Sequence, residues 1–436
     1  MIDPQQLYKR SQQVIPGATQ LLSKRAERFL PEHWPTYYSK AEGITIWGVD
    51  GKKYIDTTIM SVGTCVLGYA DPDVNQAVNE AVADGNISTL NAPEEIELAE
   101  LLIELHPWSE MVRYSRTGGE AMAIAVRLVR AHTNKETIMF CGYHGWHDWY
   151  LSANLNKNKA LDDFLLPGLE PKGVPQRLAG TMIPFEYNDI DNFVKLFNEH
   201  RRELAGVVME PIRNHPPEAG YLEKIRQLCT DNKVPLVFDE ITIGWRECDG
   251  GYHKLLGVNP DIAVFAKAMS NGYPMAAIIG KRAIMDQAQE TFISSTYWTD
   301  KVGTVAALAT IRKFKARNVA RHLKTVGKLV QDGWNTLAKK HKLQIKVHGV
   351  YALSGFEFTY KNSAAIRTLF TQYMLEHNYL ANTSFYISYA HKRNTIEKYL
   401  RRVDYVFSQL KQDIDNNAVE KKLKGPVSSN DFTRLN

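Results

Sequence analysis

Short apolar runs alternate with helical patterns through the middle of the chain, from about residue 111 to residue 280. The runs are rich in Val, Ile, Leu and Phe and cover Thr137–Phe140, Ala205–Met209, Leu236–Phe238 and Ile262–Ala266. Runs of this length without polar alternation are typical of parallel strands buried on both faces. Their alternation with helical segments predicts a mostly parallel α/β sheet that is covered by helices.

The residues before this region show a hairpin and two helices. Ile44–Trp47 and Lys53–Asp56 flank Asp50-Gly51, and an Asp-Gly pair between two strand-like runs is a strong hairpin signal. Pro72–Ala83 and Pro93–Leu105 carry apolar side chains at helical spacing. We therefore expect a hairpin followed by two helices before the alternating region.

A second region begins near residue 305. It opens with a long helical pattern and contains short strand-like runs and two later helical segments, at Gln344–Val347, Gly355–Phe358, Asn362–His377 and Thr395–Asn416. This mixture predicts a smaller domain after the large one.

One loop inside the alternating region is unusually long. It runs from Asn154 to Gly180 and is rich in Pro, Gly and Leu. Structureless loops of this length in a compact domain are either functional lids or disordered segments.

The composition narrows the function classes. The 436 residues are 44% hydrophobic, enough for a large core plus a smaller domain. The formal charge is only +5 and no coherent basic stripe is present, so we expect no nucleic-acid partner. Because the chain lacks a long apolar run and a signal-peptide pattern, we also expect no membrane association. Four scattered cysteines, at 65, 141, 229 and 248, favour reduced thiols in a cytoplasmic protein.

Two of the apolar runs end in a reactive side chain. Val234–Phe238 leads into Asp239 and Glu240, and Ile262–Ala266 leads into Lys267. Ligands bind outside the carboxyl ends of parallel strands, so we expect this carboxylate and this amine to face one crevice. A buried lysine can form a Schiff base, and a facing carboxylate can hold the pyridinium nitrogen of pyridoxal phosphate. The structural alternatives are that Asp239 caps a helix and that Lys267 is an exposed loop residue.

A candidate phosphate site precedes a strongly helical stretch, Met122–His132. Thr117, Gly118 and Gly119 would offer free backbone amides, close approach and a hydroxyl donor at the start of that helix. A plain turn with an N-cap explains the same residues, so phosphate binding is a hypothesis here.

An aromatic residue follows the strand at Thr137–Phe140. Tyr143 at this strand end can cover one face of a planar cofactor, although core packing explains a single aromatic equally well. His144 and His147 are three residues apart, but two histidines without a nearby third ligand are poor evidence for zinc. We therefore predict stacking by Tyr143 and no metal.

In this order, these residues resemble the class III (subgroup II) aminotransferases of fold type I, and most of all the glutamate-1-semialdehyde aminomutase-like branch. The resemblance spans about residues 65 to 300, and the hairpin and Phe385–His391 extend it. Its motifs are Leu67–Pro72, Thr117–Ala121, Tyr143–Gly145, Glu210-Pro211, Phe238–Ile241, Ala266–Ala268 and Ser294–Thr296.

The resemblance implies the fold and the domain division. The expected class is α/β: a fold type I transferase that depends on pyridoxal phosphate (PLP), with a mostly parallel seven-stranded sheet in its large domain and a smaller α+β domain. In the family both ends of the chain build the small domain. We therefore predict an N-terminal segment at 1–60 that joins the small domain, a large PLP-binding domain at 61–305 and a C-terminal small domain at 306–436.

The resemblance also implies roles around the cofactor ring. Lys267 would form the Schiff base and move the proton between the substrate Cα and the C4′ carbon of the cofactor. Asp239 would pair with the pyridinium nitrogen. Ile241 and Tyr143 would cover the two faces of the ring, with His144 beside Tyr143. Lys267, Asp239 and Tyr143 are the residues that the resemblance makes catalytic.

The remaining implied roles concern the phosphate and the substrate. Gly118, Gly119 and Thr117 would hold the phosphate, and Thr296 matches a residue that reaches the phosphate of the partner subunit, which implies a homodimer. Glu210 matches an acid near the cofactor or substrate. Substrate contacts would come from Thr19-Gln20, from Ser88-Thr89 and from the long loop.

Three departures from the aminomutase pattern decide the expected reaction. Leu380–Phe385 is shorter than the Gln-Phe-Glu-type segment of the aminomutases and carries no acid. Thr296 lies in Ser-Thr-Tyr-Trp-Thr-Asp-Lys instead of a glycine-rich run, and the long loop is richer in Pro and bulky apolar residues. We predict an aminotransferase that moves an amino group from an amino-acid donor, with glutamate as one candidate, to a carbonyl acceptor by a ping-pong mechanism. An aminomutase and an amino-acid racemase or epimerase are the alternatives.

Overall fold

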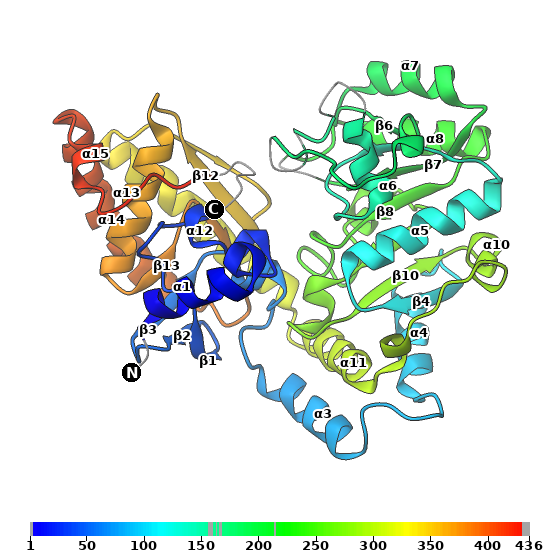
Figure 1. Cartoon of the computed structure of the whole chain (residues 1–436), viewed down its shortest axis with the longest axis horizontal. Coiled ribbons are helices and arrows are strands. Elements are labelled where there is room, and N and C mark those ends of the chain that lie inside the picture. The colour runs from blue at the N-terminus through cyan, green and yellow to red at the C-terminus, as the bar shows by residue number, and fades with distance from the viewer. Residues whose placement is uncertain (1–2, 156–159, 163, 165–167, 213–214, 430–436) are drawn as a thin grey trace. The chain divides into compact units, whose positions relative to one another are not determined.

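The computed structural model describes residues 3–155, 160–162, 164, 168–212 and 215–429. The chain divides into two compact units. One contains the residues up to Asp71 and those from Arg321 onward, and the other is Pro72–Ala320. Figure 1 shows both units with many of their elements labelled.

The larger unit is built around a seven-stranded sheet with the order β4-β10-β9-β8-β7-β5-β6. Only β10 runs antiparallel to its neighbours among these described strands. The strands are β4 (Met111–Ser115), β5 (Thr137–Cys141), β6 (Met182–Pro184), β7 (Leu204–Met209), β8 (Leu236–Asp239), β9 (Ile262–Phe265) and β10 (Ala276–Gly280). The predicted α/β fold with a mostly parallel sheet is confirmed.

Helices follow most of these strands and cover the sheet (Figure 1). The longer ones are α3 (Pro72–Ala83), α4 (Glu94–Leu105), α5 (Gly118–Thr133), α7 (Ile190–His200), α8 (Tyr221–Asp231) and α11 (Lys301–Ala316). Shorter turns are α6 (Asp148–Leu151), η4 (Ser152–Leu155), η5 (Gln176–Leu178), α9 (His253–Leu256), η6 (Lys267–Ser270), α10 (Arg282–Met285), η7 (Asp286–Gln289) and η8 (Thr296–Thr299).

Both faces of the sheet are buried. Successive residues of a strand point to opposite faces, so Ile138 and Phe140 of β5 join the cluster of side chains under α5. Met139 and Cys141 of the same strand join the second cluster, which includes the apolar faces of α7 and α8. This explains why the strands read as continuous apolar runs in the sequence.

The smaller unit is assembled from both ends of the chain. Its four-stranded sheet has the order β1-β2-β3-β13, and its three-stranded antiparallel sheet has the order β11-β12-β14. The strands are β1 (Tyr38–Glu42), β2 (Thr45–Gly48), β3 (Lys53–Thr57), β11 (Ile345–His348), β12 (Leu353–Phe358), β13 (Tyr379–Ala381) and β14 (Ser384–Tyr386). The predicted hairpin is confirmed as β2 and β3, and β13 adds to β3 in parallel.

The smaller unit also contains helices. They are α1 (Pro4–Val14), η1 (Pro16–Ala18), η2 (Leu22–Lys24), η3 (Ala26–Arg28), α2 (Met60–Gly63), α12 (Val319–His341), α13 (Ser363–Glu376), α14 (Arg393–Asp415) and α15 (Val419–Lys422). Of these helices, α13 packs on β12 and β13. Among the described residues, no helix is both long enough and apolar enough to cross a bilayer.

The boundaries of the two units lie later in the chain than those expected from the sequence, at 60 and 305. Gly43 and Tyr69 exchange two backbone hydrogen bonds of 2.8 Å each, which keeps residues 61–71 with the hairpin. At the second boundary, α11 packs on α3 and α4 and so stays with the larger unit. The expected long loop, 154–180, includes residues 156–159, 163 and 165–167, which lie outside the described residues.

A buried carboxylate joins three elements at the amino ends of β8 and β9. Asp261, only 6% exposed, accepts hydrogen bonds from Arg226 Nη1 at 2.7 Å, Lys281 Nζ at 2.6 Å and the Leu236 amide at 2.8 Å. Burial raises its pKa, but the positive charge of Arg226 and the bonds from Lys281 and Leu236 outweigh burial, so the pKa is lowered overall.

We predict that Asp261→Asn lowers the free energy of unfolding by about 2 kcal/mol at pH 7, because Arg226 loses a buried charge partner. The lowered pKa of Asp261 in the folded state stabilises the fold at pH values above 3.8, the ordinary pKa of Asp, and this stabilisation is lost as the pH falls below that value. The difference in stability between the two proteins therefore persists at pH 5. Urea unfolding followed by circular dichroism measures both values. Asp231→Asn, an exposed change at the end of α8, is the control and is expected to change stability by less than about 0.5 kcal/mol.

Candidate active site

The carboxyl ends of four parallel strands meet at one edge of the large sheet. β9, β8, β7 and β5 are consecutive strands of the sheet and run in the same direction. The chain leaves these strands through Tyr143, Glu210, Asp239 and Lys267. The topology therefore brings the predicted ring-covering residue, both acids and the lysine to one edge.

The amine of Lys267 lies within this edge. The residue is half-buried, and its Nζ donates a hydrogen bond to Thr242 Oγ1 at 2.9 Å. Burial lowers the pKa of the amine, and the nearby Arg246 guanidinium lowers it further, while Asp239 and Glu210 act in the opposite direction. A lowered pKa increases the fraction of neutral amine, which is the form that attacks a carbonyl carbon.

Asp239 is 3% exposed, and the residues directly after it form a turn and not a helix that it could cap. Its Oδ2 accepts a hydrogen bond from His144 Nδ1 at 2.8 Å, and its Oδ1 accepts one from the backbone amide of Ile241 at 3.0 Å. With Nδ1 facing the carboxylate, His144 Nε2 is buried and has no partner among the described residues. His144 therefore contacts Asp239, the residue predicted to pair with the pyridinium nitrogen.

Tyr143 and Glu210 are joined through the backbone. The Tyr143 amide donates to Glu210 Oε2 at 3.2 Å, and the Tyr143 ring meets Tyr150 edge to face, with 6.2 Å between ring centroids. Partial burial raises the pKa of the Tyr143 phenol, and the negative charges of Asp239 and Glu210 raise it further. The phenol therefore stays neutral, and 43% of the residue remains exposed.

The candidate phosphate loop begins α5. Thr117 is the N-cap: its Oγ1 accepts the Glu120 amide at 3.3 Å, and Glu120 Oε2 accepts the amides of Thr117 at 2.9 Å and Arg116 at 3.1 Å. This capping box leaves the amides of Gly118 and Gly119 without a partner among the described residues. Thr117 can therefore cap the helix while the loop also binds an anion, because the Thr117 hydroxyl hydrogen and the amides of Gly118 and Gly119 stay available for a phosphate.

Both glycines lie where a larger residue would crowd a neighbouring side chain. A Cβ atom on Gly118 would lie 2.9 Å from Ile241 Cδ1, and one on Gly119 would lie 2.9 Å from His147 Cε1. The N-terminus of α5 thus touches the segment that follows Asp239. Ile241, which is half-buried, lies between the phosphate loop and the acid.

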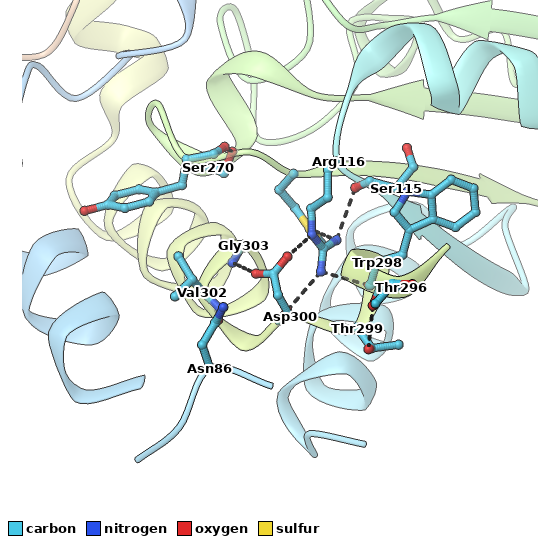
Figure 2. Close-up of polar contacts among 12 residues, drawn as sticks. Asn86, Ser115, Arg116, Ser270, Thr296, Trp298, Thr299, Asp300, Val302 and Gly303 are labelled. Atoms are coloured by element: carbon cyan, nitrogen blue, oxygen red, sulfur yellow. Dashed lines mark hydrogen bonds and ion pairs between the residues drawn. The ribbon is translucent and has the colours of Figure 1, made fainter. Parts of the chain in front are cut away.

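Thr296 begins the short turn η8 and is exposed. Its side chain makes no hydrogen bond within the described part of the chain. Figure 2 shows this turn beside Arg116 and Asp300, the residues that hold its C-terminal end. Within the described residues, Thr296 shares no hydrogen bond with Lys267 or with the Asp239–His144 pair.

Sequence reasoning missed two residues of this edge. Thr242 Oγ1 accepts a hydrogen bond from the Lys267 amine. Arg246 is only 1% exposed, and its positive charge adds to burial in lowering the pKa of Lys267. Arg246 also donates from Nε to the Thr242 carbonyl at 3.2 Å. An arginine directly after the apolar stretch Ile243–Trp245 is the signal that could have identified it, because a buried arginine needs partners.

Within the described residues, no group of three or more His, Cys, Asp or Glu side chains is arranged to hold a metal ion. Donors suited to a phosphate, an acid suited to a ring nitrogen and a lysine of lowered pKa together fit pyridoxal phosphate. Gly118 and Gly119 would bind the phosphate, Asp239 the ring nitrogen, and Ile241 and Tyr143 the ring faces. When bound, the cofactor supplies an electron sink for the substrate Cα.

The protein's own groups would do the rest of the chemistry at this edge. Lys267 Nζ can bind the carbonyl carbon and, once released, carry a proton. His144 would keep the Asp239 carboxylate oriented, and the Asp239 charge would keep a ring nitrogen protonated. Tyr143, with its neutral phenol, would cover the open side.

This fold and this site define a PLP-dependent transferase of fold type I. The chain belongs to the class-III aminotransferase family, whose model matches residues 30–414. It is a PLP-dependent aminotransferase.

The relatives include both transaminases and aminomutases. The chain is 34% identical to a 3-aminobutyryl-CoA aminotransferase of Cloacimonas acidaminovorans, over 70% of this chain and 71% of that protein. It is 31% identical to a glutamate-1-semialdehyde 2,1-aminomutase of Dechloromonas aromatica, over 93% of this chain and 99% of that protein. The solved FumI protein of Sphingopyxis sp. MTA144, in its PLP internal aldimine form, superposes with a TM-score of 0.86 at 23% identity, covering 94% of this chain and 97% of that one.

We predict that Lys267→Ala removes the visible absorbance band that lysine-bound pyridoxal phosphate gives, because no other amine is expected to take its place. An absorbance spectrum of the purified, amine-free variant after adding the cofactor is the measurement. Lys254→Ala, an exposed lysine on α9, is the control and should keep the band. A visible band that survives in Lys267→Ala would contradict the assignment.

Proposed function

We propose that this aminotransferase takes its amino group from an amino-acid donor, with glutamate as the first candidate, and passes it to a carbonyl acceptor in two half-reactions. The observation that carries this proposal is the arrangement of Lys267 beside Asp239 and Glu210. Here an amine of lowered pKa could exchange protons with a substrate while Asp239 would hold the ring nitrogen. This arrangement would serve both half-reactions of an aminotransferase.

A feature of the smaller unit favours transfer between two substrates over an aminomutase. The chain passes from β13 to β14 through Asn382 and Thr383 alone, and Asn382 Oδ1 accepts the Ser384 amide at 2.8 Å. By the resemblance described above, this tight turn corresponds to the Gln-Phe-Glu-type segment of the aminomutases. It is shorter than that segment and carries no acid, which is a departure from the aminomutase pattern.

The first experiment is an absorbance spectrum before and after adding L-glutamate without an acceptor. We expect the visible band to convert to the near-ultraviolet band of the pyridoxamine form, with 2-oxoglutarate released in equal amount. D-Glutamate and the Lys267→Ala protein are the controls. A visible band that persists would exclude glutamate as the donor and send the search to other amines.

The alternatives predict different behaviour in the same cuvette. An aminomutase would rest largely in the pyridoxamine form and turn over a single amino-aldehyde without a second substrate. A racemase or epimerase would keep the visible band and exchange the substrate Cα proton with deuterium from the solvent. Release of a keto acid in the half-reaction would exclude both.

We propose further that the active protein is a homodimer in which Thr296 reaches the phosphate held by the partner subunit. Support comes from large apolar side chains that are exposed on two segments of the larger unit: Ile87, Leu90, Ile96, Phe292 and Tyr297, at 45–89% exposure. The two segments are joined, because the Lys301 amide donates to the Asn86 carbonyl at 2.8 Å. Exposed apolar side chains in this number favour burial against another protein surface.

The cytoplasm is the proposed compartment. None of the four cysteines, all of which lie within the described residues, forms a disulfide, and Cys65, Cys141 and Cys229 are buried. Cysteines that form no disulfide agree with a reducing environment.

We predict that Thr296→Ala weakens PLP binding by about tenfold, the usual effect of losing a hydrogen bond to a charged group. Thr296→Ser keeps the hydroxyl and is expected to bind the cofactor like the parent protein. Titration of apoprotein with PLP, followed by the visible band, gives both dissociation constants, and light scattering gives the subunit number. Equal affinity in all three proteins, or a monomer, would contradict the shared site.

A further inference from the structure

Arg116 lies between two parts of the proposed phosphate machinery. It follows β4 directly and precedes Thr117, so its backbone belongs to the start of this subunit's own phosphate loop. Its side chain leaves the loop and reaches the segment that ends η8 (Figure 2). Arg116 therefore joins the loop that serves one cofactor to the turn that carries Thr296.

The guanidinium of Arg116 is fully used by these contacts. Nε donates to Asp300 Oδ2, and Nη2 donates to the carbonyls of Trp298 at 2.8 Å and Asp300 at 2.9 Å. Nη1 donates to the Ser115 carbonyl at 3.2 Å and lies 3.1 Å from Met275 Sδ. Five N–H groups thus face five acceptors, and none is left to bind a phosphate directly.

The contacts also fix the end of the turn in the fold. The side chains of Arg116 and Asp300 are only 10% and 15% exposed, so their ion pair is shielded from water. Asp300 Oδ1 accepts the Gly303 amide at 2.9 Å and so caps α11. The Trp298 side chain packs against the core cluster under α5. The exposed Thr296 is thus carried by a turn whose far end is firmly held.

We propose that Arg116 is a positioning residue that acts across the dimer. By holding the turn η8, it sets how tightly the partner subunit's site holds the phosphate of pyridoxal phosphate, whereas Thr117–Gly119 beside it serve this subunit's site. The proposal rests on the shared phosphate site proposed above. The proposal assigns to Arg116 an effect on the cofactor of the other subunit, although the Arg116 backbone adjoins the phosphate loop of its own subunit.

Mixed dimers test this directly. One subunit carries Lys267→Ala, so that only the other subunit's site gives the visible band and reports its affinity for PLP. Arg116→Met is then placed either in the Lys267→Ala subunit or in the reporting subunit. We expect the dissociation constant of the reporting site to rise about tenfold in the first arrangement and to stay within about twofold of the parent in the second.

The opposite patterns overturn the proposal. A rise only when Arg116→Met is in the reporting subunit means that Arg116 acts on its own phosphate loop, and equal rises mean a general loss of structure. No rise in either arrangement means that the turn holds its place without Arg116.

Two further variants keep the result interpretable. Asp300→Asn keeps a side-chain oxygen for the cap of α11 and removes the charge partner of Arg116, so it should give the same pattern with a smaller effect if Arg116→Met does not fold. Arg312→Met is the matched control: it also removes an arginine–carboxylate pair on α11, with Glu97, but this pair is about half exposed. It should move neither dissociation constant.

Thr296→Ala in the same mixed dimers separates the two proposals. If it weakens neither site, the shared phosphate site itself fails. If it weakens the reporting site from the opposite subunit while Arg116→Met does not, the shared site stands and only the role of Arg116 fails.

Discussion

The buried carboxylate of Asp239 is the constraint on which the rest of the site depends. A charge that is 3% exposed destabilises the fold unless it is paired and hydrogen-bonded. Asp239 meets this requirement with the His144 imidazole at 2.8 Å and the Ile241 amide at 3.0 Å. Both partners are parts of the site, because His144 follows Tyr143 and Ile241 lies against Gly118. Satisfying one carboxylate therefore fixes an aromatic residue, an apolar contact and the start of the phosphate loop around it.

Glu240, the acid next to Asp239, has a structural role, whereas Asp239 faces the site. Glu240 is fully buried and accepts the amides of Tyr252 at 2.8 Å and His253 at 2.9 Å, and the His253 ring at 2.8 Å. It therefore holds residues 251–253 in place and leaves no oxygen for the cofactor. Because successive side chains at the end of a strand point in opposite directions, Asp239 faces the site while Glu240 faces the fold. The sequence pair Asp-Glu does not by itself say which acid does which.

Much of this architecture follows from the sequence, and the failures have physical reasons. Nearly continuous apolar runs predict β5, β7, β8 and β9, and the strand ends then place Asp239 and Lys267. β13 was missed because three residues carry no periodic signal, although its parallel pairing with β3 joins the two ends of the chain. Thr242 and Arg246 were missed for a different reason. Their roles arise from distances to Lys267 across the site, and no spacing rule along the chain encodes such distances.

The backbone at Lys267 explains how the amine comes to this position. Ala266 is extended, with φ of −161°, and Lys267 has φ of +49°, a left-handed conformation that costs an L-residue about 1 kcal/mol or more. Glycine would adopt it without strain but would remove the amine, so the reactive residue itself bears the strain. The strain is held because the turn η6 that follows buries Ala268, Met269 and Ser270, and because the Met269 amide donates to the Ala266 carbonyl at 3.2 Å. Packing behind the site thus supplies the stability that places the Lys267 amine against Thr242.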